Sequence, residues 1–189
     1  MSYFRSQLES WLKTIDIEAQ KVLDIGGGTN PVNTRVGKWR IGEFKTLDNK
    51  AEEPTTSLNY VNDLNQLWCC AFLKMLLEEF DVVFCLEVME YVWNPVTAFE
   101  NFNNVLKKGG LLYISFPWIY PLHNPPGIDC LRYSENAIKK LAEESNFRIL
   151  ELKKRTMTYD SIYKEFVRAE GMHPIEDNAI GYLCKMQKI

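Results

Sequence analysis

Residues 22–31, VLDIGGGTNP, join an apolar strand pattern to three glycines and a proline. Glycines permit a tight turn and let the backbone approach a ligand closely. Pro31 suits the first turn of a helix, where its missing N–H would be unpaired in any case. Ligands of open parallel sheets bind beyond the carboxyl ends of the strands. The pattern therefore predicts a nucleotide-type site at Gly26–Gly28.

Two acidic residues that end later strand patterns fit the same site. Asp48 follows Gly28 by 20 residues, and Asp63 follows a weaker strand pattern at 59–61. The spacing of Asp48 lets its carboxylate accept hydrogen bonds from ribose hydroxyls. Each acid also has a purely local alternative, because Asp48 could cap a turn and Asp63, with Asn62, could form an Asx turn.

The glycine pattern argues against two other nucleotide-binding classes. A dinucleotide fingerprint needs glycine or alanine three residues after Gly28, where helix and strand pack closely, and Pro31 stands there. The chain also contains no GxxxxGK[ST] sequence, so a P-loop is absent. A nicotinamide-dependent oxidoreductase is disfavoured but stays a rival hypothesis.

With its flanking segments, this pattern resembles the class I S-adenosylmethionine-dependent methyltransferases. Further on, FDVVFCLEVMEYV (80–92) and VLKKGGLLYISFP (105–117) are similar to the family's "FDVV…LEH" and "LKPGG" segments. The family's first three motifs are matched in order by DIGGG (24–28), TLDNK (46–50) and YVNDL (60–64). A later segment, Pro121–Ile149, is similar to a small branch, of "methyltransferase type 11" character, often found among polysaccharide or small-metabolite enzymes.

The resemblance implies S-adenosylmethionine as cofactor, S-adenosylhomocysteine as product, and a set of cofactor contacts. It implies that Asp48 holds the ribose hydroxyls and that Asp63 accepts from the adenine amine. Asp24 would orient the glycine loop. The implied cofactor-binding residues are Asp24, Gly26, Gly27, Gly28, Asp48, Asp63, Leu64, Leu86 and Glu87.

Polar residues after strand ends four and five are the candidates for the acceptor side. They are Tyr91, His123, Asp129 and Arg132. A histidine with a pKa near 6.5 suits a general base at neutral pH, and Arg132 could hold a carboxylate or phosphate. The alternative is structural, with His123 and Arg132 pairing with Asp129 or with their own loop. His123 and His173 have no ligand-type spacing to any cysteine, so no metal site is expected.

The expected function is methyl transfer to a small-molecule or saccharide acceptor by direct in-line displacement. Asn30 stands where the family commonly has a third glycine, and Tyr91 stands where it often has histidine. These two departures support an alternative, a non-catalytic protein of the same fold that binds a ligand or partner. The acceptor atom and the oligomeric state do not follow from the sequence.

Alternating apolar strands and helical segments predict one α/β domain, residues 1–189, with an N-terminal helical segment (1–20) and a core (21–189). Its sheet is expected to be Rossmann-like and doubly wound, with seven mostly parallel strands and an antiparallel last strand. The pair Gly109-Gly110 suits a helix C-cap. Helices are predicted at 3–19, 65–79, 96–106, 134–145 and near 161–168, and strands at 21–25, 44–47, 59–61, 80–86, 111–116, 147–152 and 182–186.

Composition narrows the class of protein. Lys plus Arg is 22 and Asp plus Glu is 25, a net charge of −3, which makes nucleic acid an unlikely acceptor. The five cysteines form no CxxC pair or regular framework, so disulfides are not expected. The N-terminus lacks a signal-peptide pattern, and no apolar run approaches 18 residues. A reducing, cytoplasmic setting is the expectation.

Overall fold

A computed structural model describes residues 2–28, 30–49, 58–123, 129–157 and 179–189. The predicted helix near 161–168 and His173 lie outside these ranges. The helices are α1 (Tyr3–Leu12), α2 (Cys70–Leu76), α3 (Pro95–Val105) and α4 (Glu135–Glu144), with 3₁₀ turns η1 (Val32–Thr34) and η2 (Met89–Tyr91). The strands are β1 (Asp16–Ile25), β2 (Lys38–Asp48), β3 (Tyr60–Val61), β4 (Phe80–Cys85), β5 (Leu106–Pro117), β6 (Phe147–Thr156) and β7 (Ala179–Lys188).

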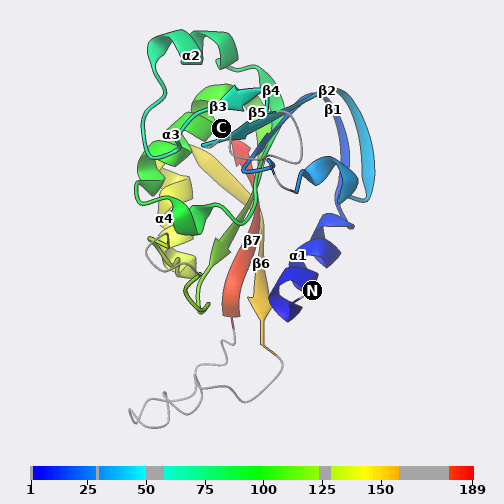
Figure 1. The fold of residues 1–189 in the computed structure, drawn as a ribbon, viewed down its shortest axis with the longest axis vertical. Coiled ribbons are helices and arrows are strands. Elements are labelled where there is room, and N and C mark those ends of the chain that lie inside the picture. Colours follow the sequence, from blue (N-terminus) through cyan, green and yellow to red (C-terminus); the bar gives the residue numbers. More distant parts are fainter. Residues whose placement is uncertain (1, 29, 50–57, 124–128, 158–178) are drawn as a thin grey trace.

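The strands form one seven-stranded sheet in the order β3-β2-β1-β4-β5-β7-β6 (Figure 1). The first five strands pair in parallel, and β7 runs antiparallel between β5 and β6. The predicted fold class, a mostly parallel sheet with an antiparallel last strand, is confirmed. The switch in strand order lies at β1 and β4, so the carboxyl ends of these strands are the expected ligand edge.

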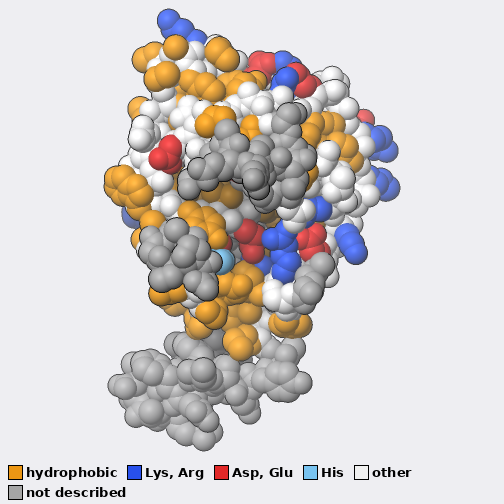
Figure 2. Space-filling view, in the orientation of Figure 1, with side chains coloured by type: hydrophobic (Ala, Val, Ile, Leu, Met, Phe, Trp, Pro, Cys, Tyr) orange, Lys and Arg blue, Asp and Glu red, His pale blue; other side chains and the backbone are white. Residues whose placement is uncertain are grey.

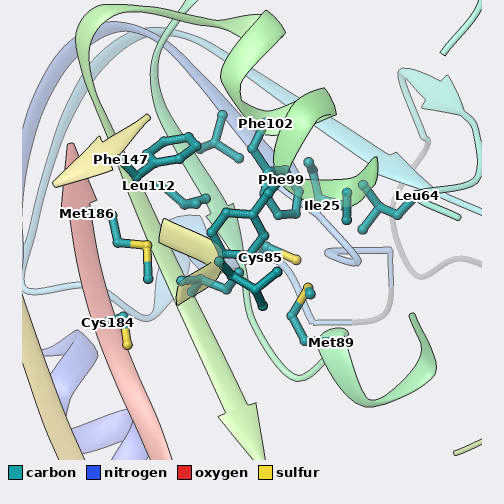
Figure 3. Close-up of a cluster of buried hydrophobic side chains, with 14 of the residues drawn as sticks. Ile25, Leu64, Cys85, Met89, Phe99, Phe102, Leu112, Phe147, Cys184 and Met186 are labelled. Carbon is teal, nitrogen blue, oxygen red and sulfur yellow. The ribbon is translucent and has the colours of Figure 1, made fainter. Parts of the chain in front are cut away.

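Two apolar clusters cover the two faces of the sheet. On one face, α3 and α4 pack against the central strands; Figure 3 shows Phe99 and Phe102 of α3 beside Phe147 of β6. On the other face, α1 inserts Leu8, Trp11 and Leu12 against β1, β4 and β5. The sheet is therefore the middle layer of three, and its backbone polar groups are shielded by packing on both sides.

Aromatic rings extend the cover that α1 provides on its face of the sheet. The Trp11 ring lies 5.9 Å from that of Tyr113, and Tyr113 stacks on Phe84 with 4.9 Å between centroids. Trp39 continues the row, 6.4 Å from Phe84 and 5.4 Å from Phe44. The described residues between β1 and β2 form only the turn η1, with Pro31 as its N-cap, so the α-helix predicted to begin at Pro31 is absent there. Large rings cover the sheet in place of that helix.

The predicted helix over 3–19 ends early because its periodicity changes. Lys13 caps α1, and β1 already begins at Asp16. From Ile15 onward, buried Ile15 and Ile17 alternate with exposed Asp16 and Glu18, the period of a strand rather than of a helix. The early start lets β1 pair with β2 from Asp16 onward.

Two further differences have local causes. The helix predicted over 65–79 is only α2, because the buried Asn101 side chain accepts from Trp68 N (3.1 Å) and donates to Gln66 O (2.9 Å). These bonds hold the start of the segment as a loop. Gly109 and Gly110 lie inside β5 and do not cap α3; Gly109 has a φ of +76°. Among the described residues, no helix has the length and apolar character needed to cross a membrane.

Candidate active site

A cavity of about 540 Å³ opens at the carboxyl ends of β1, β2 and β4. We call it the glycine-turn cavity. It includes five of the predicted cofactor residues, namely Gly26, Asp48, Asp63, Leu64 and Glu87. Apolar side chains from Ile25, Leu47, Val88 and Val92 complete much of its wall. The cavity thus combines carboxylates from the ends of three strands with an apolar surface large enough for a flat ring.

The glycine turn needs its glycines for two different reasons. Gly26 has a φ of +79°, a backbone region that side chains with a Cβ rarely adopt. Its N–H donates to Leu47 O at 2.8 Å, which ties the turn to β2. A Cβ on Gly26 would also overlap the Val88 side chain, and a Cβ on Gly27 would overlap the Asp24 carboxylate. The turn therefore packs closely against Val88 and Asp24.

Asp24 lies beneath the loop and is almost fully buried. Its Oδ2 accepts from the backbone N–H of Val32 at 2.7 Å, so the carboxylate fixes where the chain enters η1. Burial raises the pKa of Asp24 to about 7, although the hydrogen bond from Val32 opposes the shift. Asp24 therefore holds the glycine loop in place and does not line the glycine-turn cavity.

Asp48 and Asp63 both reach the cavity while making local bonds. Asp48 Oδ1 accepts from Asn49 N at 2.8 Å, and a Cβ on Gly28 would lie 2.9 Å from Asp48 Oδ2. Asp63 Oδ1 accepts from the backbone N–H of Asn65 at 2.9 Å, which forms an Asx turn. The turn uses one carboxylate oxygen of Asp63, so the Asx-turn and ligand-binding interpretations are compatible.

A second cavity of about 440 Å³ adjoins the first, and we call it the histidine cavity. Gly26, Glu87 and Tyr91 line both cavities, so the two meet at the end of β4. Figure 2 shows acidic and basic side chains gathered beside a histidine on this face of the molecule. The other residues of its wall are Ser2, Phe4, Arg5, Asn30, Arg35, Leu86, Glu90, Tyr120 and His123.

The four predicted acceptor residues divide into two groups. Tyr91 and His123 line the histidine cavity, with their rings 5.4 Å apart. Asp129 and Arg132 lie behind them: Asp129 accepts from His123 Nδ1 (2.8 Å) and from Arg132 Nη2 (2.9 Å). Arg132 also donates to the carbonyl of Tyr120 at 3.3 Å. Arg132 is therefore engaged with its own loop and is not part of the cavity wall.

The environment of Asp129 decides which ring nitrogen of His123 is available. Burial alone would raise the pKa of Asp129, but hydrogen bonds from Arg132 and from the backbone and ring of His123 outweigh it and lower the pKa to about 2. An ionised carboxylate only accepts hydrogen bonds, so Nδ1 of His123 carries the hydrogen. Nε2 is then the ring nitrogen that can accept a proton.

Comparisons with known proteins agree with this geometry. Residues 23–114 match the family model described as "Methyltransferase domain". The ubiquinone biosynthesis O-methyltransferase of Glaesserella parasuis serovar 5 (strain SH0165) is 32% identical over 114 residues, which cover 54% of this chain and 48% of the relative. The chain thus spans about half the length of that curated relative.

Solved structures share the whole fold at low identity. A methyltransferase from Mesorhizobium loti has a TM-score of 0.64 and 14% identity, covering 99% of this chain and 98% of that one. One from Archaeoglobus fulgidus has a TM-score of 0.64 and 15% identity, covering 97% and 92%. The [4+2]-cyclase SpnF has a TM-score of 0.61 and 13% identity, covering 96% and 80%.

Residues 23–114 thus match the methyltransferase family, and the fold is that of S-adenosylmethionine-dependent methyltransferases. The family match contains the first four sequence motifs and most of the fifth, since it ends at Ile114 within the segment 105–117. Members of this family use S-adenosylmethionine as cofactor. The predicted family is therefore confirmed.

Two residues beside these cavities were not among those predicted from the sequence. Glu90 is 4% exposed, lines the histidine cavity, and has no hydrogen-bond partner for Oε2 among the described residues. Burial, and next the charge of Glu87, raises the pKa of Glu90 to about 7. The available signal was an acid inside an otherwise apolar turn, VMEYV (88–92), directly after a buried strand.

The second missed residue is Arg155 of β6, which is fully buried. Its Nη1 donates to Glu87 Oε1 at 2.7 Å, and its Nη2 donates to Phe4 O at 2.7 Å. Its guanidinium carbon also lies 3.1 Å from the centroid of the Phe4 ring. Arg155 therefore joins α1 to a residue shared by both cavities. In the sequence, the basic run 153–155 resembles a solvated strand end, and no neighbouring residue indicates that Arg155 is buried.

The buried Asp24 makes the stability of the folded chain depend on pH. Its pKa is about 7 in the folded chain and about 3.9 in an unfolded one. Between these values the folded state holds a proton that the unfolded state has released, so stability falls as the pH rises toward 7. An asparagine in its place would keep an oxygen for the Val32 N–H without ionising. From pH 5 to pH 8, we expect the free energy of unfolding to decrease less in Asp24→Asn than in wild type. Urea titrations at the two pH values measure this decrease.

A matched control for that comparison is Asp16→Asn, which makes the same change at an exposed carboxylate paired with Lys38. It should keep the wild-type dependence on pH. Glu90 contributes a dependence of the same sign to all three proteins, so the slope should be reduced in Asp24→Asn rather than abolished. An unchanged slope in Asp24→Asn would contradict the assignment.

Within the described ranges, no group of three or more His, Cys, Asp or Glu side chains is placed to hold a metal ion.

Proposed function

We propose that this chain binds S-adenosylmethionine in the glycine-turn cavity and methylates a small-molecule acceptor held in the histidine cavity. The observation that carries the proposal is the meeting of the two cavities at Gly26, Glu87 and Tyr91. A donor in one cavity and an acceptor in the other would face each other across this shared edge. Such positioning is the main requirement of in-line displacement.

The residues of the glycine-turn cavity fit the cofactor. Gly26 brings bare backbone to the cavity where a Cβ could not be accommodated. Asp48 and Asp63 would accept from the ribose hydroxyls and the adenine amine, and the buried Leu64 would pack on the ring. Leu86 and Glu87, just beyond β4, would border the methionine part. When bound, S-adenosylmethionine supplies a methyl group already activated by its sulfonium.

Several observations favour a small acceptor that carries a hydroxyl. The curated relative that matches residues of this chain is named as an O-methyltransferase of ubiquinone biosynthesis. The histidine cavity is about 440 Å³, within the range of small-molecule sites. Three aromatic rings, those of Phe4, Tyr91 and Tyr120, contribute to its wall. A saccharide acceptor shares the hydroxyl chemistry and is part of the same proposal.

Calorimetric titration tests the cofactor directly. The purified chain is titrated with S-adenosylmethionine, S-adenosylhomocysteine and a nicotinamide dinucleotide. We expect micromolar binding of the first two and no heat from the third. No binding of any of them up to millimolar concentration would contradict the proposal. It would favour the alternative of a methyltransferase-like protein without this activity, a possibility that the structural likeness to a [4+2]-cyclase also supports.

The role of Asp48 gives a quantitative test. Asp48→Ala should weaken S-adenosylmethionine binding by about 1.5–3 kcal/mol, or roughly 10- to 150-fold, the usual range for a hydrogen bond involving a charged group. The measurement is the dissociation constant by calorimetry. Asp16→Ala is the matched control, because Asp16 begins β1 at the opposite edge of the sheet. An affinity for Asp48→Ala equal to that of Asp16→Ala would remove Asp48 from the site.

A further inference from the structure

Glu90 differs from two nearby acids, Glu87 in the wall of the histidine cavity and Asp129 behind it, in how its carboxylate is hydrogen-bonded. Glu87 accepts from Arg155 Nη1 and from Ser115 Oγ at 2.7 and 2.9 Å, and Asp129 accepts from His123 and Arg132. Glu90 is buried, yet its Oε2 has no partner within the described part of the chain. Glu90 also lines the histidine cavity. Since a buried polar atom without a partner is costly, a donor that a ligand brings into this cavity would stabilise the carboxylate.

The backbone around Glu90 is held firmly. Its carbonyl accepts from Cys130 N at 2.7 Å and from Leu131 N at 3.3 Å, which ties η2 to the loop that carries Asp129. The Tyr133 hydroxyl donates to Met89 O at 3.0 Å, one residue before Glu90. The unpartnered oxygen therefore belongs to a fixed turn rather than to a freely moving segment. A fixed acceptor in a cavity wall is what proton transfer from a bound molecule requires.

We propose that Glu90 is a catalytic base, which accepts the hydrogen bond and then the proton of the acceptor group that is methylated. The inference rests on the proposed function and deepens it. It restricts the acceptor to a nucleophile that carries a proton, a hydroxyl or an ammonium group. A carboxylate acceptor would have no proton to give and would be repelled by the neighbouring carboxylate of Glu87.

The proton transfer completes a balanced step. The acceptor oxygen or nitrogen forms a bond to the methyl carbon as the bond from that carbon to sulfur breaks, and the bonding pair remains on sulfur. The acceptor proton moves to the Glu90 carboxylate, and solvent removes it before the next turnover. No further reactant is required. S-adenosylhomocysteine and the methylated acceptor are the products.

The surrounding charges support a base that works near neutral pH. Glu87 and Asp129 disfavour ionisation of Glu90, and His123 favours it. Arg155 packs against the same region from β6 and also favours the ionised form. Burial is the largest influence, and the resulting pKa of about 7 lies where a general base is most effective. Tyr91 and Tyr133 are uncharged neighbours, because their own pKa values are raised.

The test compares Glu90→Gln with wild type in methyl transfer from S-adenosylmethionine to catechol or to ethanolamine. The rate is measured as the formation of S-adenosylhomocysteine. We expect kcat to fall roughly 100- to 10,000-fold, with cofactor affinity within about twofold of wild type. The wild-type kcat should rise as pH passes through about 7, and this limb should be missing in the variant. Glu100→Gln, the same change on the exposed surface of α3, should leave both properties unchanged.

His123→Asn separates Glu90 from the other candidate base. A moderate loss in His123→Asn beside the large loss in Glu90→Gln supports the proposal. Full activity of Glu90→Gln, or retention of its pH limb, would overturn it. A wild-type protein that binds S-adenosylmethionine yet methylates neither probe would overturn the proton-bearing acceptor class. A wild-type protein that does not bind the cofactor would overturn the proposed function instead.

Unfolding in urea gives a readout that needs no acceptor. At pH 8 Glu90 is ionised while its Oε2 has no partner among the described residues, which destabilises the folded chain. Glu90→Gln should therefore be at least as stable as wild type. At pH 5, where the folded chain holds the proton, the two proteins should be alike. A Glu90→Gln variant that is less stable than wild type at pH 8 would show that the carboxylate has a structural partner, and would overturn the proposal.

Discussion

Arg155→Met is expected to lower the free energy of unfolding by about 3–5 kcal/mol, the range observed when one partner of a buried ion pair is removed. Arg155 is fully buried, and its guanidinium binds the Glu87 carboxylate and the Phe4 carbonyl at 2.7 Å each. Methionine fills much of the volume but leaves the Glu87 carboxylate with only Ser115 as a side-chain partner among the described residues. The lost bonds join three elements, so the cost should appear in global stability.

Chemical denaturation checks this expectation against two other variants. Arg148→Met changes the same residue type on the same strand, where the side chain is exposed and bonds only to Gln187 within the described chain. It should change stability by about 0.5 kcal/mol or less. Arg155→Lys keeps the charge but loses the planar fork that reaches both partners, so it should fall between the two. A loss below about 1 kcal/mol for Arg155→Met would show that the buried pair contributes little.

The ligand edge of the fold was predictable because strand ends can be read from the sequence. Asp48, Asp63 and Glu87 each follow an apolar run, and parallel strands bring their carboxyl ends to one edge. Gly26 was predictable for a related reason, since only glycine readily adopts the φ observed there. The structure places all four in the glycine-turn cavity.

The remaining differences depend on contacts between distant segments. α2 is short because Asn101 binds the backbone of Trp68, 33 residues earlier. Arg155 lies 151 residues from the Phe4 carbonyl that it binds, so no local pattern marks it as buried. The oxygen of Glu90 that has no partner among the described residues becomes apparent only when η2 is packed against β5 and bonded to the loop at Cys130.

Gly26→Ala should have the second large effect, a combined loss of about 2–5 kcal/mol shared between stability and cofactor affinity. A Cβ at a φ of +79° costs about 1–2 kcal/mol. The same Cβ overlaps the Val88 side chain, and such overpacking typically costs about 1–3 kcal/mol more. Val88 lines the glycine-turn cavity, so any shift that relieves the overlap would disturb the wall on which the cofactor is proposed to lie.

Two companion variants separate these causes. In the double variant Gly26→Ala with Val88→Ala, the overlapping methyl group of Val88 is gone. The Cβ of residue 26 would then lie about 3.6 Å from the Cβ of residue 88, an ordinary contact, so only the backbone cost should remain. The resulting non-additivity, measured by denaturation and by S-adenosylmethionine titration, would report the overlap itself. Gly109→Ala has a similar φ of +76°, but its nearest neighbour, Gln187 Nε2, is 3.9 Å away. It should lose about 1–2 kcal/mol of stability and no cofactor affinity. Equal affinity losses in Gly26→Ala and Gly109→Ala would mean that Val88 and the turn do not shape the cofactor site.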